Sequence, residues 1–86
     1  MKMMWFDYQP TSGVLVHYED LNGIERTYNT NFSNPQDVVR TIAMLAHDNQ
    51  VEEITCAGVA YDLAPAIKQQ LLTTYNNESI KFVKGE

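Results

Sequence analysis

The chain has 86 residues, of which 44% are hydrophobic and 10% aromatic, and this composition indicates one small globular domain spanning residues 1–86. Six Lys and Arg against eleven Asp and Glu give a formal charge of −5, which argues against binding to a phosphate backbone. A single cysteine excludes an internal disulfide and a multi-cysteine zinc site. No apolar run is long enough to span a membrane and no signal-peptide pattern is present, so we expect a cytoplasmic protein.

The first third of the sequence predicts a meander of three antiparallel strands. Residues 3–8 place apolar groups on both faces of a first strand, as expected for a central strand buried on both sides. A turn cluster precedes a second strand over Val14 to Glu19. Asn22-Gly23 is the strongest short hairpin signal, because both residues tolerate the positive φ of a type I′ turn. Alternate polar residues over Glu25 to Thr30 then predict an edge strand.

A first helix is predicted to begin after Asn34, which can cap it, with Pro35 at its first position. Apolar residues recur at helical spacing as far as residue 46, and the polar residues 48–50 end the helix. The stripe consists of Val38, Ile42, Leu45 and Ala46.

Residues Val51 to Val83 predict a strand, a tight turn at Gly58, a second helix and a last strand. The apolar run from Val51 to Val59 is typical of a strand buried on both faces. We expect Asp62 to cap the helix, whose apolar stripe includes Ile67 and Leu71. Such a strand–helix–strand unit makes a parallel pair with a right-handed crossover.

The element order is therefore β-β-β-α-β-α-β, which predicts an α/β five-stranded mixed sheet in the order 3-2-1-4-5. In this order the chain resembles the ribonuclease H-like fold, which also forms the repeated subdomain of actin-like ATPases. The segment Ile54 to Ala60, followed by a helix, is similar to the strand–glycine–helix segment of those ATPases, although only Gly58 is present where they carry paired glycines. A ferredoxin-like sandwich with an extra strand is the alternative architecture.

The predicted sheet places the carboxyl ends of its first and fourth strands side by side. Asp7 lies near the end of the first strand and Asp62 follows the fourth, while Asp37 lies in the first turn of the helix that enters from the same edge. Three converging carboxylates would bind a divalent ion such as Mg²⁺ for phosphoryl transfer. The resemblance also implies acids at these places, but the fourth acid usual in ribonuclease H-like nucleases has no counterpart. Helix capping and the helix dipole explain Asp62 and Asp37 without a metal, and we favour this structural interpretation.

Other chemistry-bearing residues have structural interpretations. Cys56 is expected to be a small buried hydrophobe, and His47 a surface residue favoured by a helix dipole. His17 shares a predicted solvated sheet face with Glu19. Many aromatics for so small a core predict partial exposure of some of them, which is frequent at interfaces. The interface candidates are Tyr8, Tyr18, Tyr28 and Tyr61.

Two hypotheses follow. The first is a non-enzymatic accessory or regulatory module that acts by protein–protein contact, with a protein partner or as a homodimer, and needs no cofactor. Its predicted edge strand, Glu25 to Thr30, is suited to adding to a partner's sheet. The alternative is metal-dependent phosphoryl transfer or nucleotide binding, with Mg²⁺ held by Asp7, Asp37 and Asp62. Nucleic acid is an unfavourable partner for either, because of the negative charge.

Overall fold

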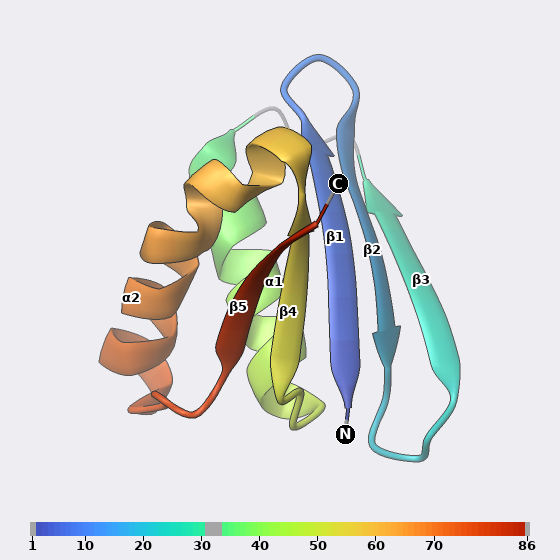
Figure 1. Cartoon of the computed structure of the whole chain (residues 1–86), viewed down its shortest axis with the longest axis vertical. Coiled ribbons are helices and arrows are strands. Elements are labelled where there is room, and N and C mark those ends of the chain that lie inside the picture. Colours follow the sequence, from blue (N-terminus) through green and yellow to red (C-terminus); the bar gives the residue numbers. More distant parts are fainter. Residues whose placement is uncertain (1, 31–33, 86) are drawn as a thin grey trace.

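Five strands form one mixed sheet in the order β3-β2-β1-β4-β5 in the computed structural model, which describes residues 2–30 and 34–85 (Figure 1). β1 pairs antiparallel with β2 and parallel with β4, while β2–β3 is antiparallel and β4–β5 parallel. The predicted mixed sheet and strand order are confirmed, and the ferredoxin-like alternative is wrong. The elements are β1 Met3–Gln9, β2 Gly13–Glu19, β3 Glu25–Thr30, α1 Pro35–Asp48, β4 Glu53–Ala57, the 3₁₀ helix η1 Gly58–Leu63, α2 Ala64–Tyr75 and β5 Lys81–Gly85.

Both helices pack on one face of the sheet, which we call the covered face (Figure 1). α1 crosses from β3 to β4 and α2 crosses from β4 to β5, so two right-handed crossovers in the same direction place both helices on the same side. Met4, Phe6 and Tyr8 of β1 point into the core there. The intervening residues of β1 face the other side, which no helix of the described residues covers. The predicted burial of the central strands on both faces is therefore wrong.

The ends of the helices follow the sequence signals with one exception. Asn34 caps α1, since its side chain accepts a hydrogen bond of 2.9 Å from the Gln36 N–H. Asn76 ends α2 in the left-handed conformation, with φ of 53°. Asp62 does not cap α2, because Gly58, with φ of 52°, turns the chain into η1, and the cap position falls on Leu63. Neither helix has the length and apolar character needed to cross a membrane, as far as the described residues extend.

The hairpin between β2 and β3 has the predicted position but a different turn. Gly23 has φ of 79°, whereas Asn22 is not in the left-handed region, so the turn is not type I′. The Gly23 N–H donates to the Asp20 carbonyl at 3.0 Å, and the Asp20 N–H donates to the Ile24 carbonyl at 2.9 Å. The connection is therefore a longer loop closed by Asp20 and Ile24, in which glycine alone supplies the positive φ.

Candidate functional site

The three predicted acids lie at the same end of the molecule, where β1 and β4 end and α1 and η1 begin (Figure 1). Asp7 pairs in register with Ala57, which confirms that the ends of β1 and β4 are neighbours. Asp37 forms a long ion pair with Arg40, with 3.7 Å between Oδ1 and Nη1. Asp62 is exposed in η1.

These acids do not form a cluster. Asp7 alternates with buried Phe6 and Tyr8, so it belongs to the uncovered face, whereas α1, which carries Asp37, packs on the opposite side. Within residues 2–30 and 34–85, no three His, Cys, Asp or Glu side chains lie close enough to hold a metal ion. The topology brings the strand ends together, but side-chain alternation separates the carboxylates.

Divalent ions are therefore expected to leave the protein unchanged at this end. Titration with Mg²⁺ or Mn²⁺ should not alter the emission of Trp5, which shares the uncovered face with Asp7. A saturable change in emission that disappears in Asp7→Asn but persists in Asp37→Asn would contradict this expectation and show a metal site at Asp7.

The four tyrosines predicted as interface residues occupy different environments. Tyr8 is only 6% exposed and belongs to the core. Tyr18 and Tyr28 are half-buried and pack against the core from β2 and β3. Tyr61 is 38% exposed and lies in η1. They form no common patch, so the aromatic count did not locate the apolar surface.

A partly apolar surface lies on the uncovered face of the sheet, which the sequence-based prediction placed in the core. The strand register sets Met3, Trp5 and Asp7 of β1 beside the outward residues of β2, β3, β4 and β5. Met3 is 48% exposed, and Trp5, Leu15 and Val83 are half-buried. We define the open face by its three cross-strand rows, given from β3 to β5: Glu25, Glu19, Met3, Glu53 and Lys81; Thr27, His17, Trp5, Thr55 and Val83; and Asn29, Leu15, Asp7, Ala57 and Gly85.

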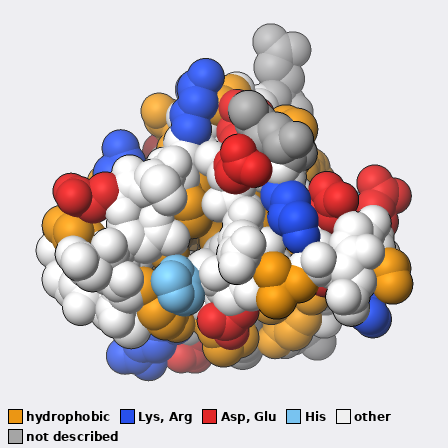
Figure 2. Space-filling view, turned by 90° about the horizontal axis from the view of Figure 1, so that it is seen from below, with side chains coloured by type: hydrophobic (Ala, Val, Ile, Leu, Met, Phe, Trp, Pro, Cys, Tyr) orange, Lys and Arg blue, Asp and Glu red, His pale blue; other side chains and the backbone are white. Residues whose placement is uncertain are grey.

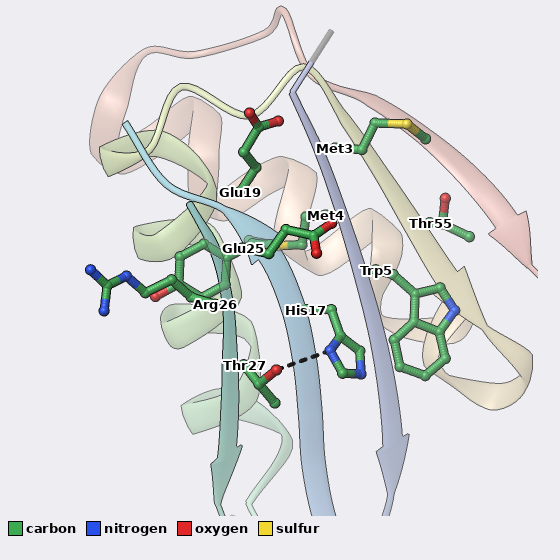
Figure 3. A pocket seen from close by; sticks show the side chains of 10 residues that line it. Met3, Met4, Trp5, His17, Glu19, Glu25, Arg26, Thr27 and Thr55 are labelled. Carbon is green, nitrogen blue, oxygen red and sulfur yellow. Dashed lines mark hydrogen bonds between the residues drawn. The ribbon is translucent and has the colours of Figure 1, made fainter. Parts of the chain in front are cut away.

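Trp5 and His17 lie side by side at the centre of the open face (Figure 3). Their ring centroids are 5.3 Å apart with an angle of 37° between the planes. The Nδ1 atom of His17 is 3.2 Å from the Thr27 hydroxyl, within hydrogen-bond distance, and this contact fixes the imidazole beside the indole. A shallow hollow of about 610 Å³ lies over these residues, extending toward Met3 and Thr55. The result is an ordered aromatic surface that is accessible from outside.

Carboxylates lie in the rows on either side of the row that contains Trp5. Glu19, Glu25 and Glu53 lie in the row of Met3, and Asp7 lies on the other side of Trp5. Lys81 is the single cation in the three rows. This face therefore has an apolar middle and a negative border, which favours a ligand with positive groups.

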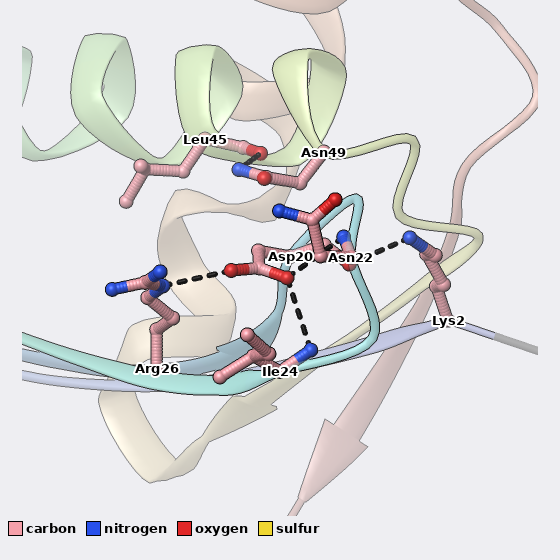
Figure 4. Close-up of polar contacts among 7 residues, drawn as sticks. All are labelled: Lys2, Asp20, Asn22, Ile24, Arg26, Leu45 and Asn49. Atoms are coloured by element: carbon pink, nitrogen blue, oxygen red, sulfur yellow. Dashed lines mark hydrogen bonds and ion pairs between the residues drawn. The ribbon is translucent and has the colours of Figure 1, made fainter.

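Asp20 is the buried charged residue of the described chain, with 8% exposure. One of its oxygens accepts the N–H groups of Asn22 and Ile24 at 2.9 and 3.0 Å, and the other accepts Nε of Arg26 at 2.7 Å (Figure 4). The hydrogen bond from Arg26 lowers the pKa of the Asp20 carboxyl below its usual value, and the Ile24 N–H lowers it further. Asp20 thus organises the β2–β3 loop and has no free oxygen for a ligand.

Asp20→Asn is expected to lower the melting temperature at neutral pH, because the amide loses the charge that holds Arg26 and the two N–H groups. A carboxyl with a depressed native pKa stabilises the fold above its unfolded pKa, and this contribution is lost as pH falls through the native pKa. The melting temperatures of wild type and variant should therefore converge in acid. Thermal melts followed by circular dichroism at neutral pH and in acid check this, with Asp37→Asn as a surface control. A difference that stays constant with pH would contradict it.

His47 lies in the last turn of α1, as predicted, but is half-buried rather than freely exposed. Its ring stacks on Tyr75 with centroids 4.2 Å apart, and the Asn77 amide nitrogen is 3.3 Å from its Nδ1. The end of the molecule seen from below shows acidic, basic and hydrophobic side chains in separate small groups, with other side chains and backbone between them (Figure 2). Neither His47 nor this end forms a single-sign surface for a charged ligand.

The sequence-based prediction missed the open face and the role of Asp20. An Asp two residues before Asn-Gly is a signal for a side chain that bonds to the backbone of the turn. The open face had a signal too, in the alternation of Met3, Trp5 and Asp7, but only the placement of the helices shows that it is uncovered. No protein-family model matches the chain, and no curated protein matches it in sequence.

Proposed function

We propose that this chain acts by protein contact and binds a partner protein through the open face. The observation that carries the proposal is a sheet with both helices on one side and Met3, Trp5, Leu15 and Val83 exposed or half-exposed on the other. Contiguous apolar surface bordered by polar groups is typical of protein interaction sites. Aromatic side chains held in place by neighbours, as Trp5 is by His17, are favourable contact residues.

The border charges indicate what the partner presents. Glu19, Glu25 and Glu53 would repel phosphates, so stacked nucleotide bases are a poor occupant despite the half-buried Trp5 indole on this face. Arg or Lys side chains would pair with these carboxylates, and a cation placed over Trp5 would gain a cation–π contact. We therefore infer a protein partner whose contact surface combines apolar and basic residues.

A second copy of the chain fits the open face less well than a basic partner. Two open faces brought together would juxtapose the carboxylates of both copies, and like charges at an interface are costly. We expect sedimentation at low ionic strength to show a monomer. A dimer that dissociates in a Met3→Asp variant would instead assign the open face to self-association.

The test of the proposed function uses a matched pair of variants. Met3 on the open face and Met44 on α1 are similarly exposed, at 48% and 43%, so Met3→Asp and Met44→Asp make the same chemical change on different surfaces. Affinity capture from the native cell should recover a protein with wild type and Met44→Asp but not with Met3→Asp. High salt should weaken the capture, because exposed ion pairs are screened. Equal recovery by both variants would reject the open face as the contact surface.

We also propose kinship with the ribonuclease H-like fold. The strand order and the parallel arrangement of β1, β4 and β5 support it. A shared fold does not transfer an activity, and the separation of Asp7 from Asp37 gives metal-dependent phosphoryl transfer no geometric support. An experimental structure whose strands and both helices fail to superpose on that fold would reject the kinship.

A further inference from the structure

A second surface lies at the other side of the molecule, in the groove between α2 and β5. This groove has a volume of about 800 Å³ and is lined by apolar groups from both elements and from η1. Leu72 and Tyr61 on its walls are 37% and 38% exposed, and half-buried Phe82 lies on its β5 side. The groove is separate from the open face, because Phe82 belongs to the covered side of the sheet, in register with Ile54.

β5 borders this groove with unused backbone hydrogen-bonding groups. The Lys81 N–H donates to the Glu52 carbonyl at 3.0 Å, and in a parallel ladder every second residue bonds to the same neighbour. Residues 81, 83 and 85 therefore bond to β4, while the N–H and C=O groups of Phe82 and Lys84 point away from the sheet. Among the described residues no strand pairs with this edge of β5.

The side chains of Phe82 and Lys84 share the covered side, so a strand added at this edge would place alternate side chains over the groove. Main-chain bonds at a free edge and adjacent side-chain pockets are the two requirements of peptide recognition by strand addition. The α2–β5 groove meets both requirements.

Charge distinguishes the middle of the groove from its two ends. Nζ of Lys68, in the second turn of α2, is 5.7 Å from the centre of the Phe82 ring. The two lining carboxylates, Asp62 and Glu78, come from the segments that precede and follow α2. Lys68 is the one Lys or Arg among the described residues that line the groove, and Lys84 extends from β5 on the same side as Phe82, whereas Lys81 belongs to the open face. An acidic side chain is therefore complementary to the middle of the groove, and apolar side chains to Leu72 and Phe82.

We propose that the α2–β5 groove binds an extended peptide segment of a partner protein, which pairs with the edge of β5 and carries an acidic residue two positions from an apolar one. The segment adds a sixth strand beyond β5, bonded to the outward groups of Phe82 and Lys84. Its acidic side chain faces Lys68. This contact is independent of the open face and of the proposed function there.

Fluorescence anisotropy with two labelled, terminally blocked peptides tests the proposal on the full chain. The probe Ser-Val-Thr-Glu-Thr-Val-Ser presents Val, Glu and Val on one side of a strand, and the comparison peptide has Lys in place of Glu. Wild type should prefer the Glu peptide. Lys68→Glu changes an exposed residue on α2 and leaves the core intact. It should lower the affinity for the Glu peptide and raise the affinity for the Lys peptide, each by about threefold, as expected for a partly screened ion pair.

Backbone pairing is tested separately at Lys84. Lys84→Pro removes an N–H that points away from β4, so it keeps the β4–β5 ladder and blocks the added strand. Lys84→Ala removes the same charge but keeps the N–H. The affinity of Lys84→Pro for the Glu peptide should be about tenfold lower than that of Lys84→Ala, the equivalent of one lost hydrogen bond. Met44→Asp should bind as wild type does.

Several results would overturn the proposal. Equal affinity of wild type for the two peptides would reject an acidic occupant, and so would unchanged peptide affinities in Lys68→Glu. Equal affinity of Lys84→Pro and Lys84→Ala for the Glu peptide would reject a strand paired with β5. A concentration-dependent dimer that Lys84→Pro abolishes would assign the edge of β5 to a second copy of the chain instead.

Discussion

Phe6→Ala is expected to remove about 3–5 kcal/mol of stability, because it leaves a cavity at the centre of the covered face. Phe6 is fully buried and is the largest of the completely buried side chains. A domain of this size has a free energy of unfolding of about 4–13 kcal/mol, so the variant loses between a quarter and all of it. Chemical denaturation followed by circular dichroism measures the change.

Two further variants calibrate this result. Ile42→Val, at another fully buried position, should cost about 0.5–1.5 kcal/mol, and Met44→Ala, on the exposed side of α1, less than about 0.5 kcal/mol. A Phe6→Ala variant that unfolds at the same denaturant concentration as Met44→Ala would contradict the assignment of the core to the covered face.

Cys56 is expected to react with a thiol reagent at least about a thousandfold more slowly in the native protein than in denaturant. The side chain is fully buried on β4, so labelling requires opening of the fold, whose equilibrium constant follows from the free energy of unfolding. Burial also raises the pKa of the Cys56 thiol from 9.0 to about 11, which lowers the thiolate fraction near pH 8.

The raised pKa of Cys56 also gives a pH dependence of stability. The neutral thiol is favoured in the fold, so its contribution to the free energy of unfolding is complete below pH 9.0 and is lost as pH rises toward about 11.

In the labelling experiment, Cys56→Ser treated under the same conditions controls for reaction at other groups. Labelling as fast in the native state as in denaturant would show that β4 is accessible and would contradict the buried position of Cys56.

The positions of the open face and the α2–β5 groove follow from the connections between the elements of this small two-layer fold. Right-handed crossovers in one direction put α1 and α2 together, and a sheet of five strands then retains one face without a helix. The same arrangement leaves β5 at an edge with α2 beside it. The open face and the α2–β5 groove are thus consequences of topology. They differ in charge, because carboxylates border the first and Lys68 lies at the middle of the second.

The sequence determined the elements and their order, because the relevant signals are local. Asn34 and Pro35 begin α1, Asn76 ends α2, and Glu25 to Thr30 is the edge strand, as their side chains and backbone preferences predicted. The parallel neighbours β1 and β4 followed from the handedness of crossover connections.

Only the tertiary structure decided which face of the sheet is covered, since apolar residues on both sides of β1 are compatible with one helical layer or two. It also separated Asp7 from Asp37, because strand alternation turned the first carboxylate away from the helices. The turn at Gly23 depended on the Asp20 carboxylate reaching Asn22, Ile24 and Arg26, a set of contacts that exists only when the hairpin is closed. Side-chain direction and long-range contact, which a local pattern does not encode, account for each of these differences.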